Sequence, residues 1–155
     1  DPMHKIFSTI KELAIEYKGV CHFFYPVHPN PNVASMANDI LGTIENVTLS
    51  GPLDYSDFIT LMNISHLILS DSGGIQEEAS FLRKKILLLR DTTERPEAID
   101  NGAVELVGTD PEKIIKAFKN NINSGSFPNH FNPNIYGDGS SSLKISNYLK
   151  EIQWK

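Results

Sequence analysis

A serine and two glycines stand between an apolar run and the start of a helical pattern, in the segment Asp71-Ser72-Gly73-Gly74. Paired glycines let the backbone approach an anion closely, the first N–H groups of a helix point outward, and the Ser72 hydroxyl adds a donor. These residue types in this order indicate a phosphate cradle. Glu78, about one turn further, offers acceptor oxygens that suit two neighbouring ribose hydroxyls. A structural interpretation also fits, in which Ser72 caps the helix and Glu77 and Glu78 complement its dipole.

A second polar segment, Arg90 to Glu97, also follows an apolar run and is longer than a tight turn needs. Arg95 stands beside Pro96, a residue typical of helix starts, and its guanidinium is a planar fork that suits phosphate or sugar oxygens. A solvated loop that holds an internal Arg–Glu pair explains this composition equally well.

His28 opens a third polar segment, His28 to Asn32, in which two prolines and two asparagines impose a turn. His28 is either a ligand contact or a structural histidine that donates to a neighbouring carbonyl. No spacing of His, Asp and Glu is typical of a metal site, and neither a Gly-x-Ser-x-Gly element nor a Gly-x-x-x-x-Gly-Lys-Ser/Thr loop is present. We therefore expect neither a metal nor a cofactor.

Alternating apolar runs and helical patterns must position these three segments. Short apolar runs predict strands at Val20–Val27, Val47–Leu49, His66–Ser70, Ile86–Leu89 and Val104–Val107. Helical periodicity predicts helices at Pro2–Tyr17, Val33–Leu41, Asp54–Asn63, Ile75–Leu82, from Pro96, and at Pro111–Asn120. Apolar strands separated by helices are typical of a parallel sheet covered on both faces, so we predict an α/β fold with a doubly wound, Rossmann-like sheet. Ligands bind such sheets beyond the carboxyl ends of the strands, where all three polar segments fall.

The last third of the chain is predicted to leave the sheet. Asn121 to Tyr136 is rich in Asn, Gly, Ser and Pro and is typical of a surface crossing. Ser141 to Trp154 has helical periodicity. We expect this terminal helix to dock five apolar side chains on the domain, namely Leu143, Ile145, Tyr148, Leu149 and Ile152.

Composition narrows the class of protein. A chain of 155 residues that is 40% hydrophobic supports one domain, residues 1–155, with a substantial core. Its 14 basic and 19 acidic residues give a net charge of −5 without a Lys/Arg block, which argues against nucleic-acid binding. The only cysteine, Cys21, allows no intramolecular disulfide, so we expect a reducing, cytoplasmic setting. No leader is recognisable, and no apolar stretch approaches the roughly 20 residues that cross a bilayer.

Five motifs follow one another along nearly the whole chain: HPNPNV, DYSDFITLMN, LILSDSGGIQEEA, RDTTERPEAIDNGAVELVGTD and YGDG. Together they resemble the C-terminal domain of the non-hydrolysing UDP-N-acetylglucosamine 2-epimerases. The motifs DSGGIQEEA and RDTTERPE at this mutual spacing are highly specific. The resemblance implies the C-terminal half of a two-domain, glycosyltransferase-B-type architecture, in which two Rossmann-like domains face a cleft and UDP lies mostly on this half.

The resemblance also implies residue roles. It places Ser72 to Gly74 at the diphosphate and Glu78 on the ribose hydroxyls, the roles that the residue types already indicate. It further implies that Phe58 lies beside the uracil and Arg95 at the nucleotide-sugar. His28 would lie near the cleft, where family members bind substrate or a second, activating UDP-GlcNAc.

The implied reaction interconverts UDP-GlcNAc and UDP-ManNAc. UDP is eliminated across C1 and C2 to leave an unsaturated sugar, and is then added back with inversion at C2. For that chemistry the UDP site is a clamp on the leaving group, because it stabilises charge that develops on the diphosphate as the C1–O bond breaks.

Two features of the family lie outside this sequence. Members carry a strand ending in a His-Arg-Arg-Glu motif before the helix that starts here at Asp1-Pro2-Met3, and an N-terminal domain that supplies the acid/base carboxylates. General acid–base catalysis needs a titratable group within hydrogen-bond reach of the proton that moves. We therefore expect no catalytic residue in this chain and no epimerase activity from it alone. Its expected partners are UDP or UDP-GlcNAc, the N-terminal domain and further copies of itself.

The family's additional strand would lie in the middle of the sheet, between the predicted strands Val20–Val27 and His66–Ser70. Without it these two strands must pair directly, accept a strand from another copy, or remain as exposed edges. We hypothesise a rearranged or self-associated sheet.

Three alternatives stay open for the function. The chain can be the nucleotide domain of the hydrolysing relative that releases UDP and free ManNAc, or that of a glycosyltransferase of the same build. From a different class, it can be a module that binds nucleotide without chemistry.

Overall fold

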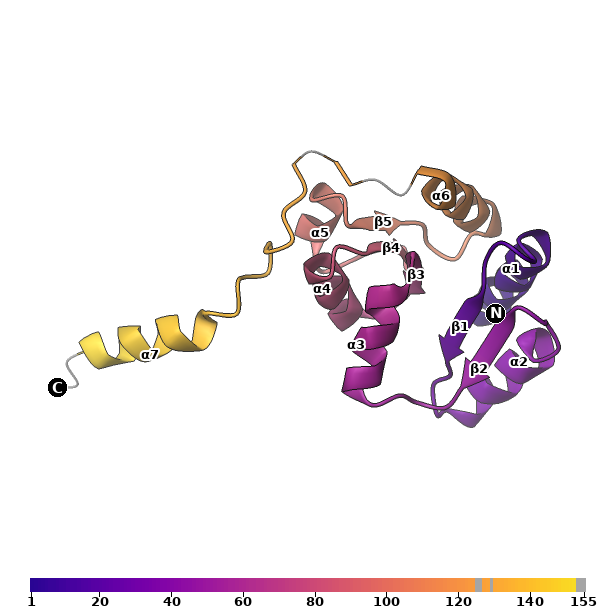
Figure 1. Cartoon of the computed structure of the whole chain (residues 1–155), viewed down its shortest axis with the longest axis horizontal. Coiled ribbons are helices and arrows are strands. Elements are labelled where there is room, and N and C mark those ends of the chain that lie inside the picture. Colours follow the sequence, from indigo (N-terminus) through magenta and orange to yellow (C-terminus); the bar gives the residue numbers. More distant parts are fainter. Residues whose placement is uncertain (125–126, 129, 153–155) are drawn as a thin grey trace.

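The computed structural model describes residues 1–124, 127–128 and 130–152, and in it parallel strands alternate with helices (Figure 1). In chain order the elements are α1 (Pro2–Glu16), β1 (Phe23–Pro26), α2 (Pro31–Leu41), β2 (Val47–Ser50), α3 (Tyr55–Ile64), β3 (Leu67–Ser70), α4 (Gly73–Phe81), β4 (Lys85–Leu88), α5 (Pro96–Asp100), β5 (Val104–Leu106), α6 (Pro111–Ser124) and α7 (Ser141–Glu151). Every strand pairing in the described residues is parallel. The predicted α/β class is confirmed.

The strands form two sheets rather than one. β1 pairs with β2, with Phe23 opposite Val47, and the order of the second sheet is β3-β4-β5, with Leu67 opposite Lys85. β1 and β3 do not pair with each other, so each is an edge of its own sheet within the described chain. Direct pairing of β1 with β3 was one of the three arrangements expected for a sheet that lacks its middle strand. It is not found in the described chain.

Strand β4 shows how the second sheet is covered on both faces. Leu87 packs into a core cluster shared with Leu13 of α1, Leu41 of α2 and Ile114 of α6. Its two neighbours along the strand, Ile86 and Leu88, face a second cluster, which includes Met62 of α3, Ala79 of α4 and Ala98 of α5. Successive side chains of a strand point to opposite faces, so the uninterrupted apolar run of β4 requires helices on both sides.

The two sheets share the first of these clusters. Phe23 and Tyr25 of β1 and Leu67 and Leu69 of β3 all pack against it. Side-chain packing therefore holds the sheets together, although no backbone ladder joins them within the part of the chain that the structure describes.

Local sequence signals explain where the helices begin. The side chain of Asp1 accepts from the backbone N–H of Met3 at the start of α1, and that of Asp54 accepts from Asp57 at the start of α3. Such side-chain caps satisfy N–H groups that have no partner within the helix.

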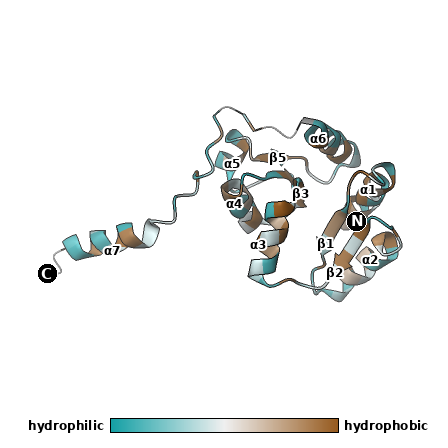
Figure 2. Cartoon of the chain, in the orientation of Figure 1, coloured by the Kyte–Doolittle hydropathy of each residue, from teal (hydrophilic) through white to brown (hydrophobic). Residues whose placement is uncertain are grey.

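Two expectations for the C-terminal part are wrong. α6 continues to Ser124, four residues beyond the predicted end at Asn120, so the crossing begins later. α7 does not dock on the described part of the domain: none of its residues is buried, and the side chains of Leu143 and Tyr148 are 63% and 66% exposed. α7 stands away from the rest of the chain in Figure 1, and in Figure 2 its ribbon carries both hydrophobic and hydrophilic colours. Trp154, expected in the same helix, lies outside the described residues.

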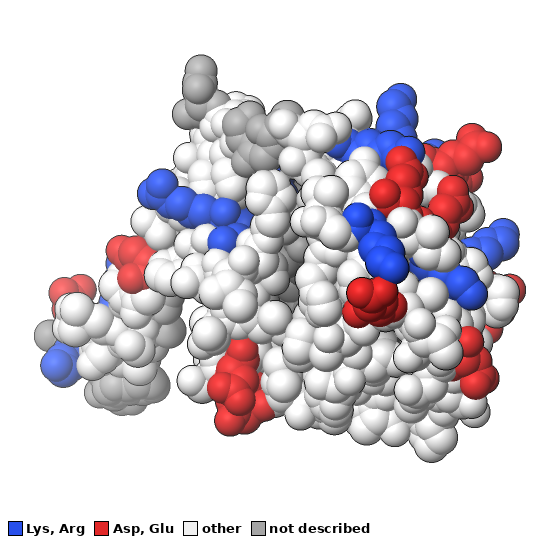
Figure 3. Space-filling model, turned by 45° about the vertical axis from the view of Figure 1, so that its right-hand side comes forward, with Lys and Arg blue, Asp and Glu red and all other residues white. Residues whose placement is uncertain are grey.

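Two further features concern the charged side chains of the surface and the lengths of the helices. Basic and acidic side chains are interspersed on the face seen in Figure 3. Among the described helices, none combines the length and apolarity needed to span a membrane.

Candidate functional site

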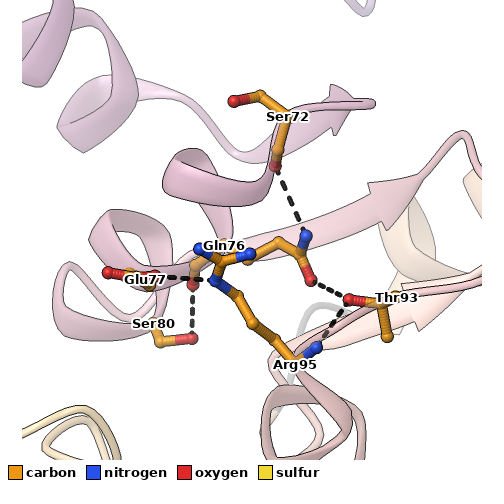
Figure 4. Close-up of polar contacts among 6 residues, drawn as sticks. All are labelled: Ser72, Gln76, Glu77, Ser80, Thr93 and Arg95. Atoms are coloured by element: carbon orange, nitrogen blue, oxygen red, sulfur yellow. Dashed lines mark hydrogen bonds and ion pairs between the residues drawn. The ribbon is translucent and has the colours of Figure 1, made fainter.

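The candidate phosphate cradle lies where β3 ends and α4 begins. Ser72 is the N-cap residue of α4, yet its side chain makes no capping hydrogen bond. Its backbone N–H donates to the hydroxyl of Ser70 at 3.1 Å, and its carbonyl accepts from Nε2 of Gln76 at 3.4 Å. In Figure 4 the Ser72 hydroxyl points away from that amide. The exposed hydroxyl therefore does not perform the capping role that the structural interpretation gave it.

Arg95 is held against this helix start by two sets of contacts (Figure 4). Its Nε donates to the Glu77 carboxylate at 2.6 Å, in an ion pair whose side chains are 27% and 45% exposed. Its backbone N–H donates to the hydroxyl of Thr93 at 3.1 Å, and this hydroxyl donates to Oε1 of Gln76 at 3.0 Å. The hydrogen bond to Glu77 raises the pKa of the Arg95 guanidinium. The second polar segment is therefore tied to α4 and presents a permanent positive charge there.

The two glycines lie in different surroundings. A Cβ added to Gly73 would come within 2.6 Å of Nη1 of Arg95, so the guanidinium rests directly on the Gly73 backbone. A Cβ added to Gly74 would meet no atom from beyond its own helix turn within 4 Å in the described residues. The helix start thus places a cation over one glycine and leaves the backbone of the other accessible, an arrangement that suits an anion of more than one phosphate group.

Glu78 is half-buried on α4 and forms part of the wall of a groove of about 620 Å³ between α3, α4 and residues 133–137. Tyr136 lines the same groove, and its hydroxyl is buried without a hydrogen-bond partner in the described part of the chain. Burial, together with the negative charge of Glu97, raises the pKa of Tyr136 to about 12 although the positive charge of Arg95 lowers it. The Tyr136 hydroxyl is therefore protonated at neutral pH.

Phe58 lies on α3, half-buried against the second core cluster. The structure thus gives Phe58 a packing role in the same layer as α4. Its expected contact with a uracil base stays a prediction.

His28 lies exposed just after β1, and its Nδ1 accepts a hydrogen bond from the backbone N–H of Asn30 at 3.2 Å. The expected structural role was donation to a carbonyl, so the contact found is of the opposite kind.

Burial raises the pKa of the Tyr25 hydroxyl, and the negative charge of Asp71 raises it further. Tyr25 belongs to β1, and Asp71 directly follows β3.

The structure therefore joins the segments around Ser72 and Arg95 directly, and places Glu78 on the neighbouring groove and His28 at a separate strand end. Sequence reasoning missed Gln76 and Thr93 and gave Glu77 only a helix-dipole role. Gln76 is fully buried, although its side chain is polar. The sequence pattern could have identified Gln76 as buried. Gln76 and Ser80 lie beside the apolar residues of α4 and so fall on the buried side of the helix; these apolar residues are Ile75, Ala79 and Leu82.

In residues 1–124, 127–128 and 130–152, no group of three or more His, Cys, Asp or Glu side chains is arranged to hold a metal ion.

Known proteins are similar to this chain in both amino-acid sequence and fold. Residues 1–150 match the family described as UDP-N-acetylglucosamine 2-epimerase. The chain is 46% identical to the UDP-N-acetylglucosamine 2-epimerase of Yersinia pestis over 151 residues, which are 96% of this chain and 40% of that protein. It is 43% identical to the enzyme of Escherichia coli K12 over 150 residues, 94% of this chain and 39% of the relative.

Solved structures agree with these relatives. The crystal structure of UDP-GlcNAc 2-epimerase from Neisseria meningitidis bound to UDP-GlcNAc superimposes with a TM-score of 0.85 at 41% identity, covering 97% of this chain and 41% of that one. The Staphylococcus aureus MnaA–UDP structure gives a TM-score of 0.87 at 39% identity, covering 99% of this chain and 44% of that one. The chain spans about 40% of the length of the curated relatives it matches. By this match over residues 1–150, the chain belongs to the UDP-N-acetylglucosamine 2-epimerase family and corresponds to one domain of its members.

Proposed function

We propose that this chain is the C-terminal, UDP-binding domain of a UDP-GlcNAc 2-epimerase. The observation that carries the proposal is the start of α4, where the Arg95 guanidinium rests on Gly73 beside a serine hydroxyl that caps nothing. Two related structures were solved with UDP-GlcNAc or UDP, which supports a nucleotide of this kind as the ligand.

Each part of the nucleotide has a candidate partner. Ser72, the two glycines and the first-turn N–H groups of α4 bind the diphosphate together with Arg95, because donors and positive charge converge there. Glu78 accepts from the ribose hydroxyls, and Phe58 packs against the uracil. His28 serves the substrate or a second UDP-GlcNAc at the cleft.

In the full-length enzyme these groups stabilise the leaving group. As the bond between the sugar C1 and the UDP oxygen breaks, negative charge grows on the diphosphate, and the Arg95 guanidinium and helix N–H groups are already oriented toward it. The acid and base that move the proton at C2 belong to an N-terminal domain. The cytoplasmic setting inferred from the single Cys21 remains part of the proposal.

Isothermal titration of the 155-residue chain with UDP tests the binding role. We expect a dissociation constant for UDP below about 1 mM. Uridine at the same concentration is expected to give no heat, because it lacks the diphosphate that the guanidinium and the helix start contact. Arg95→Ala is expected to weaken UDP binding at least about tenfold. The matched control is Lys119→Ala. Lys119 lies on α6 and forms another 2.6 Å ion pair, with Glu16 of α1, so this variant also removes the cation of an ion pair. Absence of heat with UDP at millimolar concentration would refute the proposed function.

Activity provides a second, independent check. In a coupled assay for UDP-ManNAc the chain alone is expected to give no turnover above the blank, because the acid and base lie in the other domain. Measurable epimerisation by this chain would show that it contains its own catalytic groups.

A further inference from the structure

We propose that Glu77, Gln76 and Thr93 are positioning residues that fix the Arg95 guanidinium over the start of α4 before a diphosphate binds. This inference rests on the proposed function, since it concerns how the UDP site is organised. It concerns contacts within the protein, and none of the three residues is required to touch the nucleotide.

The side chain of Arg95 is fixed by Glu77. An arginine has many rotamers, and ordering one at a surface costs conformational entropy. The 2.6 Å contact engages Nε, which leaves the two terminal nitrogens directed at Gly73, with Nη1 against its backbone. A carboxylate this close to an anion site repels the anion unless it is paired, so its position is explained by the orientation it imposes on the guanidinium.

The backbone of Arg95 is fixed by a second path through Gln76. Both ends of this buried amide are engaged, since Nε2 donates to the Ser72 carbonyl and Oε1 accepts from Thr93. The Thr93 hydroxyl then accepts from the backbone N–H of Arg95. One fully buried side chain therefore links the N-cap of α4 to the residue that carries the cation (Figure 4).

The two paths start from adjacent residues of α4 and converge on Arg95. The buried Gln76 amide is hydrogen-bonded at both ends and so has one low-energy arrangement, and together with the Glu77 ion pair it sets the distance between guanidinium and helix start in advance. Binding then avoids the cost of ordering the arginine at the moment of association.

A double-mutant cycle with UDP separates positioning from simple stabilisation. We expect Glu77→Gln to raise the dissociation constant about 5- to 10-fold when Arg95 is present, and less than about twofold in an Arg95→Ala background. The matched control is Glu16→Gln, which neutralises the acidic partner of the Lys119 ion pair and is expected to leave UDP affinity unchanged. A merely structural role for Glu77 would produce the same loss in both backgrounds.

Thr93 supplies a second test that does not depend on Glu77. Thr93→Ser keeps the hydroxyl and is expected to bind UDP within about twofold of the original chain, whereas Thr93→Val loses both hydrogen bonds and is expected to weaken binding at least about fivefold. Circular dichroism confirms which variants are folded. If Glu77→Gln does not fold, the comparison of Ser and Val at position 93 decides the matter.

The outcomes of the two proposals are distinct. If the original chain binds UDP but Glu77→Gln acts equally with and without Arg95, or Val at position 93 binds as well as Ser, the positioning inference is refuted and the proposed function stands. If the original chain does not bind UDP at all, the proposed function fails and this inference falls with it.

Discussion

At the scale of single residues, Gly73 and Gly74 occupy neighbouring positions of one helix turn but face different surroundings. Gly73 makes room for the guanidinium of Arg95, which belongs to the protein, whereas nothing in the described chain lies within 4 Å of a Cβ at Gly74. An added methyl group at Gly74 therefore meets only what binds from outside. This difference allows the fold and the binding role of the helix start to be tested separately.

We expect Gly74→Ala to keep or slightly raise thermal stability and to weaken UDP binding at least about tenfold. Alanine is a better helix former than glycine by up to about 1 kcal/mol, and its Cβ has open space in the folded chain. The same Cβ displaces a phosphate group that approaches the backbone. Thermal unfolding and calorimetry on one preparation measure both effects, and unchanged UDP affinity would place the diphosphate elsewhere.

At the scale of elements, α6 and α7 are both amphipathic but differ in whether their apolar side chains have a partner. α6 buries Ile114, Ala117 and Phe118 in the core cluster shared by the two sheets. α7 buries nothing in the described chain. Helical periodicity predicts an apolar face, and it does not say which surface covers that face.

Removal of residues 141–155 is therefore expected to shift the thermal midpoint by less than about 2 °C, because none of the described residues of α7, Ser141–Glu151, is buried. Ile114→Ala in α6 serves as the contrast, with an expected loss of about 2–5 kcal/mol from a fully buried position. Differential scanning calorimetry compares the two variants. A large drop on truncation would mean that α7 packs on the domain in solution.

At the scale of the whole molecule, the two separate sheets are the feature with the widest consequences. Within the described residues, β1 and β3 each have one side without a partner strand. Unpaired edges of this kind accept strands from other chains. The relatives that share this fold are more than twice as long, since the chain covers about 40% of them, so other parts of such proteins are available to cover these edges.

The chain by itself is accordingly expected to self-associate through β1. Sedimentation velocity at tens of micromolar should show species heavier than the 17.3 kDa monomer. Phe24→Lys, on the exposed face of β1, is expected to reduce association because charges on edge strands oppose pairing. Leu106→Lys is the matched control on β5, where the side chain is similarly exposed at 38%. A monomer at all concentrations, or equal effects of the two lysines, would argue against association at this edge.

The sequence alone determined the α/β class, the approximate position of each strand and helix, and the polar segments at the strand ends. Those properties follow from local signals, namely apolar runs, helical periodicity and turn residues, which act within a few positions along the chain. The motif order around Ser72 and Arg95 was sufficient to indicate the family, which the match over residues 1–150 confirms. The ligand contacts of these residues stay predictions.

Only the tertiary structure decided how the two main segments are joined. Glu77 and Arg95 are 18 positions apart and Gln76 and Thr93 are 17 apart, and these pairs meet because β3 and β4 lie side by side and bring the segments that follow them to one edge. The same holds for the split between β1 and β3 and for the exposed face of α7. Each depends on which surfaces pack together across the whole chain, and periodicity within a single element carries no information about that choice.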